Sequence, residues 1–291
     1  MFSASDVKTL REKTGAGMLD CKKALDACNG SLDEAVDWLR EKGIAKAAKK
    51  SDRIAAEGLS QVFINGNKGV VLEINCETDF VAKNDEFKSV ALKIGNALLS
   101  HDVTDNDEAM NLDVDGETIN DLIIGLTSKL GEKISFRRFK SITKTDNENF
   151  GSYIHMGGRI ASLVVIEGGN EDVAREVAMH AAAMRPLYLN AEEVPTEVLE
   201  KEKEIMRQEL LNEGKPADKI ENILVGKVRK YYEDVCLENQ IFVKAENKET
   251  VSKYLENNGA KLVSMIRFEV GEGIEKRQDD FAQEVMNQVN A

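Results

Sequence analysis

The stretch VLEINCETDFV, residues 71–81, places the carboxylate of Asp79 beside the ring of Phe80 where a β-rich segment ends. Two interpretations are open. Asp79 could cap a following helix while Phe80 packs against its own domain as a hydrophobic staple. Alternatively, Phe80 stays exposed and inserts into a partner protein, with Thr78 and Val81 beside it. Burying such a ring contributes ~2–3 kcal/mol, and phenylalanine has few rotors to order.

The same choice arises at Met18 and Leu19, which directly follow the turn Gly15-Ala16-Gly17. They are either part of a helical core or an apolar contact patch, and the flanking glycines favour the patch a little. The turn follows a predicted helix rather than a strand and lacks a Lys-Ser/Thr pair. It is therefore not a phosphate-binding loop.

Residue types that could support catalysis or bind metal are present but not arranged for it. The candidates are His101, His155, His180, Cys21, Cys28, Cys76, Cys236 and the acidic stretch 101–116. The histidines match no catalytic triad, and the cysteines form no CxxC pair. The acidic stretch lacks the complete calcium-loop pattern, so a solvated loop is favoured. We therefore expect no enzyme, no metal and no cofactor, and free thiols in a reducing compartment.

The overall charge limits the classes of partner. A net charge of −13 argues against a general nucleic-acid binder, because phosphates require a positive face. The basic cluster Lys46, Lys49, Lys50 and Arg53 could contact RNA or an acidic protein, although a solvated basic linker is the simpler interpretation. No apolar run reaches the ~20 residues of a membrane span. The N-terminus has no signal-peptide pattern. We expect a cytoplasmic protein that contacts neither membrane nor nucleic acid.

The N-terminal part predicts three short helices. Ser5 is expected to cap the first, over 6–13, and Asn29-Gly30 to end the second, over 18–27. Ser31 to Glu34 has the form of a capping box, which begins a third helix that closes at Gly43. A basic linker over 44–53 follows.

The middle of the chain predicts a weak internal repeat of a β-hairpin followed by a helix. The expected strands are 58–64, 70–76, 133–142, 151–156 and 160–166, and the expected helices are 85–99, 117–130 and 171–184. The paired strands align at an offset of 92 residues, and the helices that follow them at 85. The first copy therefore carries seven extra residues, which fall within NCETDFVAKND.

Two helices that fold back on each other are predicted within 196–239. Apolar stripes on both sides of Gly214-Lys215-Pro216 describe an αα-hairpin, a type of element that often mediates self-association. A strand over 241–243, a helix over 250–257 and a strand over 261–270 follow. The latter strands are expected to complete the sheet begun at 151–166. A last helix is predicted over 275–289.

Five segments together resemble the bacterial elongation factor Ts family, whereas any one alone would be weak. They are TGAGMLDCKKAL (14–25), NCETDFVAKND (75–85), GSYIHMGGRI (151–160), AMHAAAMRP (178–186) and RFEVGEGIEK (267–276). They occur in this order and span nearly the entire chain. The resemblance implies a guanine-nucleotide exchange factor for elongation factor Tu.

The expected fold is α+β. The resemblance implies an N-terminal three-helix bundle of the ubiquitin-associated (UBA-like) type, a two-part α/β core, an inserted antiparallel helical hairpin and a C-terminal helical module. We expect a bundle with its linker at 1–54, a first core subdomain at 55–145 and a second at 146–190 with 240–270. The hairpin is then 191–239 and the C-terminal module 271–291.

The resemblance also assigns partner-binding roles. Asp79 and Phe80 correspond to a pair that pushes into the GTPase near its magnesium site, and Leu130 to a core position that supports this intrusion. Met18 and Leu19 correspond to the bundle's contact with a helix of the GTPase domain, although Leu19 replaces the more usual methionine. His155 corresponds to a contact elsewhere on elongation factor Tu. Phe281 and Val285 correspond to the C-terminal grip.

Three questions stay open at this level. A chaperone or scaffold could use the hairpin and bundle as docking surfaces, and a cryptic enzyme could use the acidic loop or His180. The helical hairpin could support a homodimer, a 2:2 complex with elongation factor Tu, or neither.

Overall fold

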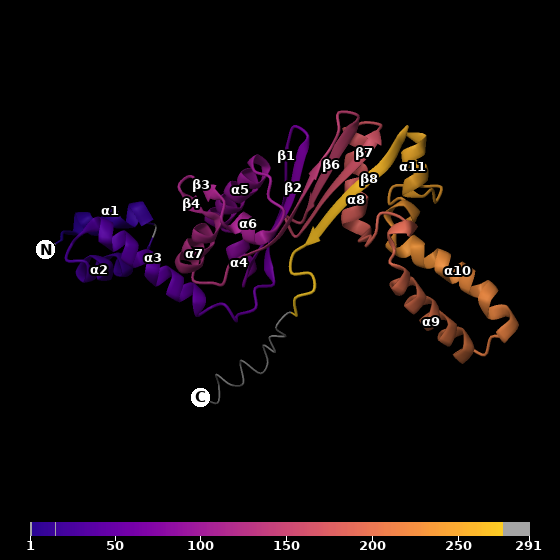
Figure 1. Ribbon diagram of the computed structural model, residues 1–291, viewed down its shortest axis with the longest axis horizontal. Helices are drawn as coiled ribbons and strands as arrows, with labels where there is room; N and C mark the ends of the chain where they lie inside the picture. Colours follow the sequence, from indigo (N-terminus) through magenta and orange to yellow (C-terminus); the bar gives the residue numbers. More distant parts are fainter. Residues whose placement is uncertain (1, 15, 276–291) are drawn as a thin grey trace. The chain divides into compact units, whose positions relative to one another are not determined.

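The computed structural model describes residues 2–14 and 16–275. The chain divides into two compact units. Unit 1 comprises Met1–Ser60, Leu72–Phe139 and Glu269–Ala291, and unit 2 comprises Gln61–Val71 and Lys140–Phe268. We describe each unit by itself, with the helix and strand labels of Figure 1.

Unit 1 begins with the predicted bundle of three helices, α1 (Ala4–Thr14), α2 (Met18–Ala27) and α3 (Leu32–Ala48). Their shared core is small and apolar: Val7, Leu10, Cys21, Ala24, Leu25, Cys28 and Ala35. The prediction that Ser5 caps α1 is wrong. Ser3 does so, because its Oγ accepts from the amide of Asp6 at 3.3 Å. The predicted turn at Asn29-Gly30 is confirmed, since both residues have positive φ.

Helix α3 runs through Gly43, so the prediction that it ends there is wrong. Glycine in a helix interior costs ~1 kcal/mol relative to alanine. Here Gly43 lies against Ile124 and Ser128 of α7 (Ile119–Leu130), at distances where an added Cβ would make ordinary van der Waals contact. Alanines after Gly43 then extend the helix, and Lys46 of the predicted linker becomes helical.

The longer strands and helices of this half of the chain follow the predicted order. Strands β1 (Glu57–Asn65), β2 (Lys68–Cys76) and β5 (Ser135–Thr143) form a sheet in the order β1-β2-β5 and contribute residues to both units. The helices are α4 (Asp79–Ala82), α5 (Asp85–Ser100), α6 (Asn106–Met110) and α7. Between α6 and α7 lie the short paired strands β3 (Asp113–Val114) and β4 (Glu117–Thr118). The four short elements, α4, α6, β3 and β4, were not predicted.

The acidic stretch is thereby explained by local structure. Asp105 caps α6 by accepting from the amide of Glu108 at 2.8 Å. Asp113 accepts from the amide of Gly116 in the turn between β3 and β4. These carboxylates satisfy turn and cap donors.

Unit 2 is built on a second three-stranded sheet in the order β6-β7-β8, from β6 (Glu148–His155), β7 (Ile160–Gly168) and β8 (Ala260–Glu269). The prediction that the late strand completes this sheet is confirmed. Helix α8 (Glu171–Met184) packs on β6 and β7. Gly151 permits this packing, because a Cβ there would lie 2.0 Å from the backbone of Ala174. The core beneath α8 is made of Val164, Ile166, Val173, Val177 and Ala181 with their neighbours.

The rest of unit 2 is mainly helical. After the 3-10 turn η1 (Ala191–Glu193), α9 (Thr196–Asn212) and α10 (Ala217–Val235) lie side by side as the predicted αα-hairpin (Figure 1). Leu210, Ile220 and Leu224 are buried between them. The turn η2 (Leu237–Asn239) and α11 (Val251–Asn257) then lead to β8.

Two further predictions need comment. The strand predicted over 241–243 is wrong, because only a single bridge from Ile241 to Thr250 forms. Phe242 instead stacks on Tyr254 at 4.1 Å, and the amide of Val243 donates to His180. The last predicted helix, over 275–289, lies almost entirely outside the described residues.

Candidate functional site

The connection between β2 and α5 holds an exposed aromatic side chain. Phe80 is 82% exposed on the short helix α4, which Thr78 caps by accepting from the amide of Val81 at 3.4 Å. Asn84, rather than Asp79, caps the following helix α5. The interpretation of Asp79 and Phe80 as a helix cap and a hydrophobic staple is therefore wrong. The ring does not pack within its own unit.

Asp79 is held beside the exposed ring by a charge pair along the same helical turn. Its carboxylate accepts from Nζ of Lys83 at 2.6 Å. This hydrogen bond lowers the pKa of Asp79 below its ordinary value, so the group is ionised at neutral pH. The exposed tip thus presents an anion and an apolar ring on adjacent residues.

A glutamate that follows α7 fixes the start of this connection. The Glu132 carboxylate accepts from the amide of Glu77 at 3.1 Å, the amide of Thr78 at 2.9 Å and the Thr78 hydroxyl at 2.6 Å. Charge-assisted hydrogen bonds of this kind are stronger than neutral ones. Sequence reasoning missed Glu132. Its only signal was a carboxylate directly after the Leu130-Gly131 helix end.

Glu77 fastens the same point from the other side. It accepts from the amide of Lys133 at 2.5 Å and from the guanidinium of Arg53 at 3.2 Å. Nζ of Lys133 in turn donates to the carbonyls of Ser51 and Arg53. Part of the basic cluster predicted as a linker therefore braces the base of the connection.

The buried cysteine beneath the connection is structural. Burial, with the nearby Glu132 carboxylate, raises the pKa of the Cys76 thiol to about 12. The thiol hydrogen bonds to the carbonyl of Thr78 at 3.1 Å. Because the thiolate is the nucleophile, a thiol that stays protonated is inert at neutral pH.

The other predicted contact residues of unit 1 lie as follows. Met18 and Leu19, at the start of α2, are 58% and 74% exposed and take no part in the bundle core. Leu130 is the half-buried last residue of α7, and Gly131 ends that helix with φ of 79°. Leu130 is thus two residues before Glu132, which holds the base of the Phe80 connection.

His155 belongs to unit 2, where it is exposed at the end of β6. Its ring stacks on Tyr153, whose hydroxyl lies 3.4 Å from Nδ1. The adjacent Ile154 and Met156 are also exposed. This makes a second apolar tip, at the β6–β7 turn. Phe281 and Val285 lie outside the described residues.

The candidates for enzymatic chemistry have structural explanations. His180 is fully buried; its Nε2 pairs with Oε1 of Gln240 at 3.0 Å, and its Nδ1 accepts from the amide of Val243 at 3.0 Å. Burial lowers the pKa of His180, so it stays neutral. Within residues 2–14 and 16–275, no group of three or more His, Cys, Asp or Glu side chains could hold a metal ion.

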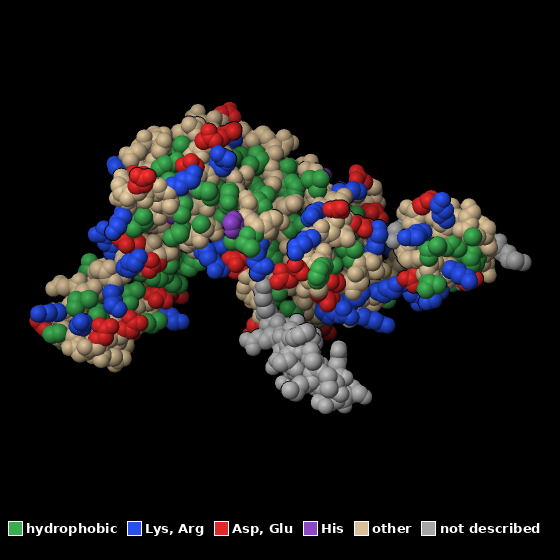
Figure 2. All heavy atoms as spheres, turned by 180° about the vertical axis from the view of Figure 1, so that it is seen from behind, with side chains coloured by type: hydrophobic (Ala, Val, Ile, Leu, Met, Phe, Trp, Pro, Cys, Tyr) green, Lys and Arg blue, Asp and Glu red, His purple; other side chains and the backbone are tan. Residues whose placement is uncertain are grey.

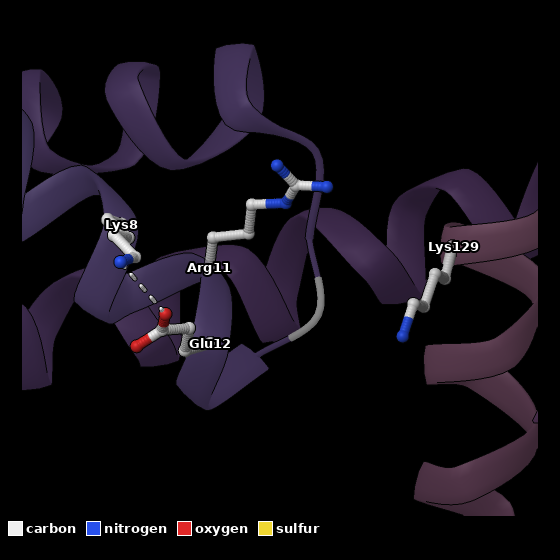
Figure 3. Close-up of a pocket in the computed structure, with 4 residues that line it drawn as sticks. All are labelled: Lys8, Arg11, Glu12 and Lys129. Carbon is white, nitrogen blue, oxygen red and sulfur yellow. Dashed lines mark ion pairs between the residues drawn. The ribbon is translucent and has the colours of Figure 1, made fainter.

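A cavity of about 370 Å³ lies in unit 1, lined by Lys8, Arg11 and Glu12 of α1 and by Lys129 of α7 (Figure 3). Lys8 pairs with Glu12 at 3.8 Å. Three cations and one carboxylate supply no nucleophile and no polarised acid–base pair. Lys129 is likewise paired, with Glu86, so two of the three cations already have a carboxylate partner.

A buried charge cluster was also missed. Glu73 of β2 is fully buried and pairs with Arg137 at 2.9 Å and Arg138 at 2.6 Å, both on β5. The signal in the sequence was a glutamate inside the apolar run VVLEI, with two adjacent arginines in a later strand. A buried carboxylate requires such partners.

The surface carries both signs of charge. On the face shown in Figure 2, acidic and basic side chains are interspersed with hydrophobic ones. None of the helices in the described part of the chain is long and apolar enough to cross a membrane. Exposed apolar tips, one of them on a braced connection, without catalytic groups among the described residues, are typical of a protein that acts by binding another protein.

Comparison with known proteins defines the class further. A family model described as Elongation factor TS matches residues 77–272. The chain is 50% identical over 289 residues to elongation factor Ts of Limosilactobacillus fermentum, covering 99% of both chains. It is 48% identical over 289 residues to that of Limosilactobacillus reuteri, again covering 99% of both. It is 50% identical over 288 residues to that of Pediococcus pentosaceus, covering 99% of this chain and 98% of the relative.

The chain therefore belongs to the elongation factor Ts family. It is a translation elongation factor that promotes guanine-nucleotide exchange on elongation factor Tu, and it is not an enzyme. The predicted family and activity are confirmed.

Proposed function

We propose that the β2–α5 connection is the part of the protein that releases GDP from elongation factor Tu. In this proposal Phe80 and Asp79, flanked by Thr78 and Val81, intrude near the Mg²⁺ and phosphate site of the GTPase, and GTP can then bind. The observation that carries the proposal is the 82% exposed Phe80 ring on a connection braced by Glu132 and Glu77. A rigid support lets the ring displace a partner group instead of folding away.

The energetics follow from linkage. Octahedral Mg²⁺ tolerates little displacement of its ligands. Insertion of residues 78–81, which we call the wedge, would move these ligands and so weaken GDP binding without occupying the nucleotide site. Reciprocity requires GDP to weaken binding of the factor by the same ratio. Burying the Phe80 ring is worth ~2–3 kcal/mol. That is enough to change GDP affinity by roughly 30- to 150-fold.

Further contacts hold the partner while the wedge acts. We assign Met18 and Leu19 to a helix of the GTPase domain, because both are exposed beside a fully formed bundle core. Leu130 supports the wedge through the chain segment that leads to Glu132. His155 docks elsewhere on elongation factor Tu with its exposed neighbours. Phe281 and Val285 are assigned to a C-terminal grip on the GTPase domain.

The functional division we propose follows these contacts. A UBA-like bundle occupies 1–54, and two repeated sheet-plus-helix subdomains occupy 55–145 and 146–190 with 240–270. A C-terminal helical module occupies 271–291. The hairpin 191–239 is an insertion in the second subdomain.

We further propose that the hairpin supports a homodimer or a 2:2 complex with elongation factor Tu. Ile205, Leu211 and Val225 are exposed on α9 and α10, and such residues favour association. Sedimentation of the wild type and of Val225→Glu, alone and with elongation factor Tu, tests this. We expect the substitution to shift the assembly to the monomer or 1:1 complex. Identical sedimentation of both proteins would contradict it.

The wedge is tested by stopped-flow release of labelled GDP from elongation factor Tu. We expect Phe80→Ala to slow the maximal release rate ~30- to 100-fold, because the wedge energy is lost. The free energy of unfolding should change by less than ~0.5 kcal/mol, since the ring is exposed.

Leu92→Ala is the matched control, because Leu92 is an exposed apolar residue of α5 in the same unit. It should leave both quantities unchanged. If Phe80→Ala instead destabilised the protein by several kcal/mol, or released GDP at the wild-type rate, the wedge would be contradicted.

A further inference from the structure

We infer that the buried charge cluster of unit 1 is a positioning device that fixes the start of the C-terminal module on the strand that leads to Phe80. We call Glu73, Arg137, Arg138, Gly271 and Glu272 the arginine clamp. The inference rests on the proposed function, because it assumes that Phe80 and the C-terminal module contact the same partner.

Glu73 is the centre of the clamp. Oε1 accepts from Arg137 at 2.9 Å, from the amide of Gly271 at 2.8 Å and from Nδ2 of Asn75 at 3.0 Å. Oε2 accepts from Nε of Arg138 at 2.6 Å. The carboxylate thus joins β2, β5 and the segment after β8 at one buried point.

The two arginines extend the clamp outward over the same segment. Nη2 of Arg138 donates to the carbonyl of Glu269 and to the carboxylate of Glu272, both at 3.2 Å. Arg137 donates to the carbonyl of Glu272. Every one of these bonds is made to residues 269–272, where the chain enters the C-terminal module. Planar guanidinium groups fix direction as well as distance.

The backbone of this segment is adapted to the clamp. Gly271 has φ of 74°, and a Cβ there would lie 2.2 Å from the carbonyl oxygen of Ala56. Only glycine can therefore bring its amide to Glu73. The amide of Ile274 closes a turn onto the carbonyl of Gly271 at 3.0 Å. The motif RFEVGEGIEK thus has a local physical explanation in this turn.

Stability alone does not explain the clamp. Taking charges out of water is costly, and apolar residues of similar volume are often at least as stabilising as a buried ion pair. What the charges add is one defined arrangement of three chain segments. Glu73 lies three residues before Cys76, after which the Phe80 connection begins, so strand β2 leads from the centre of the clamp to the wedge.

The consequence concerns binding of the partner. When two contacts are held on one rigid support, the second forms at a high effective concentration once the first has formed. Loosening the clamp should therefore weaken capture of elongation factor Tu–GDP, while the wedge still acts on the captured partner. A positioning role predicts a change in KM rather than in kcat.

The test is a double-mutant cycle in the full-length protein, with Arg138→Gln and Phe281→Ala, read as steady-state nucleotide exchange against the concentration of elongation factor Tu–GDP. We expect each single variant to raise KM about tenfold and to change kcat less than twofold. The KM of the double variant should be about equal to that of either single variant, because both substitutions remove the same contact. Arg138→Lys, which keeps the charge but not the fork, should give an intermediate KM and keeps the test available if Arg138→Gln folds poorly.

Arg175→Gln is the control, since Arg175 forms an ion pair with Asp172 on α8 at 3.4 Å and lies outside the proposed partner contacts. It should leave KM unchanged. Multiplying effects in the double variant, an unchanged KM for either single variant, or an Arg138→Gln defect confined to kcat would overturn the inference. Phe80→Ala separates the two proposals: if it lowers kcat while the cycle shows no coupling, the wedge stands and the clamp falls.

Discussion

Two connections in this molecule perform the same topological task in different ways. Each follows the inner strand of a hairpin and leads into a helix. After β7 the chain needs only Gly169 and Asn170 to reach α8, whereas after β2 it uses residues 77–84 to reach α5. Both helices begin with an asparagine cap and two acidic residues. The helix starts are therefore equivalent, and the difference lies in what precedes the cap.

The short connection shows that the fold does not require the long one. Gly168 and Gly169 turn the chain with positive φ, and nothing apolar is left exposed between the strand and the helix cap. The long connection adds α4, an exposed ring and a set of charged braces. Burial cannot explain that addition, because Phe80 is not buried. The added residues are better explained by contact with a partner.

Grafting the short connection into the first unit should give the largest effect. A chain in which a single glycine replaces residues 77–83, with Asn84 retained as the cap, should release GDP from elongation factor Tu at least ~100-fold more slowly, because the wedge is absent. The free energy of unfolding should fall by only ~1–3 kcal/mol, from the lost partners of Glu132. Stopped-flow release and urea unfolding measure the two. GDP release at the wild-type rate by this chain would contradict the proposal that the long connection is needed for exchange.

Removing the Glu132 carboxylate tests whether the position of the Phe80 ring matters, because the ring itself is still present. Glu132→Ala keeps the Phe80 side chain but removes the acceptor of the Glu77 and Thr78 amides, so the connection is no longer held. We expect nucleotide exchange to slow by roughly tenfold and the free energy of unfolding to fall by ~1–3 kcal/mol. Glu148→Ala is the counterpart in unit 2, where Glu148 accepts from the amide of Thr145. It should leave the exchange rate unchanged. An equal loss of exchange in both variants would point to general destabilisation.

The bundle contact should give a smaller effect on a different parameter. Leu19→Ala with Met18→Ala removes two exposed apolar side chains, and we expect KM for elongation factor Tu–GDP to rise roughly five- to tenfold at nearly constant kcat. Val7→Ala is the contrasting variant, because Val7 is a core residue of the same bundle. It should lower stability before it changes KM. If the surface variant instead destabilised the bundle, Met18 and Leu19 would be core residues after all.

The smallest expected effect is a pH dependence of stability in unit 2. His180 has a lowered pKa in the folded state. Below about pH 6.5, its imidazole is therefore protonated in the unfolded chain but stays neutral in the folded chain. The free energy of unfolding should therefore not depend on His180 above that pH. Below it, the free energy of unfolding should fall as the pH decreases, by at most ~1.4 kcal/mol per pH unit.

His180→Gln, which cannot titrate, should flatten this dependence between pH 6.5 and 5. The buried groups around the ring are Gln240, Phe242 and the amide of Val243, none of which titrates there. Glu176 has a lowered pKa, through hydrogen bonds from Tyr254 and Lys244, so its stabilising contribution is constant between pH 6.5 and 5 and is lost only at lower pH. An unchanged slope in the variant would exclude His180 as the source.

The sequence predicted most helices and strands, because apolar periodicity and turn residues are local signals. Helix α2 begins at Met18 and ends at Ala27 as expected, and α8 spans Glu171–Met184 as expected. Errors arose where tertiary contacts overrode local signals. Gly43 stays helical because α7 packs against it, and residue 241 forms only one bridge because Phe242 and His180 hold the neighbouring chain elsewhere.

The site was predictable in part. Exposure of Phe80 could not be derived from its own neighbourhood, since a staple was equally compatible with the sequence. The extra length of one repeat and the family resemblance favoured an exposed Phe80 that contacts a partner. Glu132 and the Glu73 cluster were not predicted, because each joins segments more than fifty residues apart. A single sequence does not specify such pairings.

The most direct measurement of the central claim is GDP release at saturating factor, with and without Mg²⁺ bound to elongation factor Tu, for the wild type and for Phe80→Ala. If the wedge acts by disturbing the Mg²⁺ and phosphate site, the large difference between the two proteins in Mg²⁺ should shrink several-fold when Mg²⁺ is removed by a chelator. Leu92→Ala should follow the wild type under both conditions. A Phe80→Ala defect of the same size with and without Mg²⁺ would contradict the account.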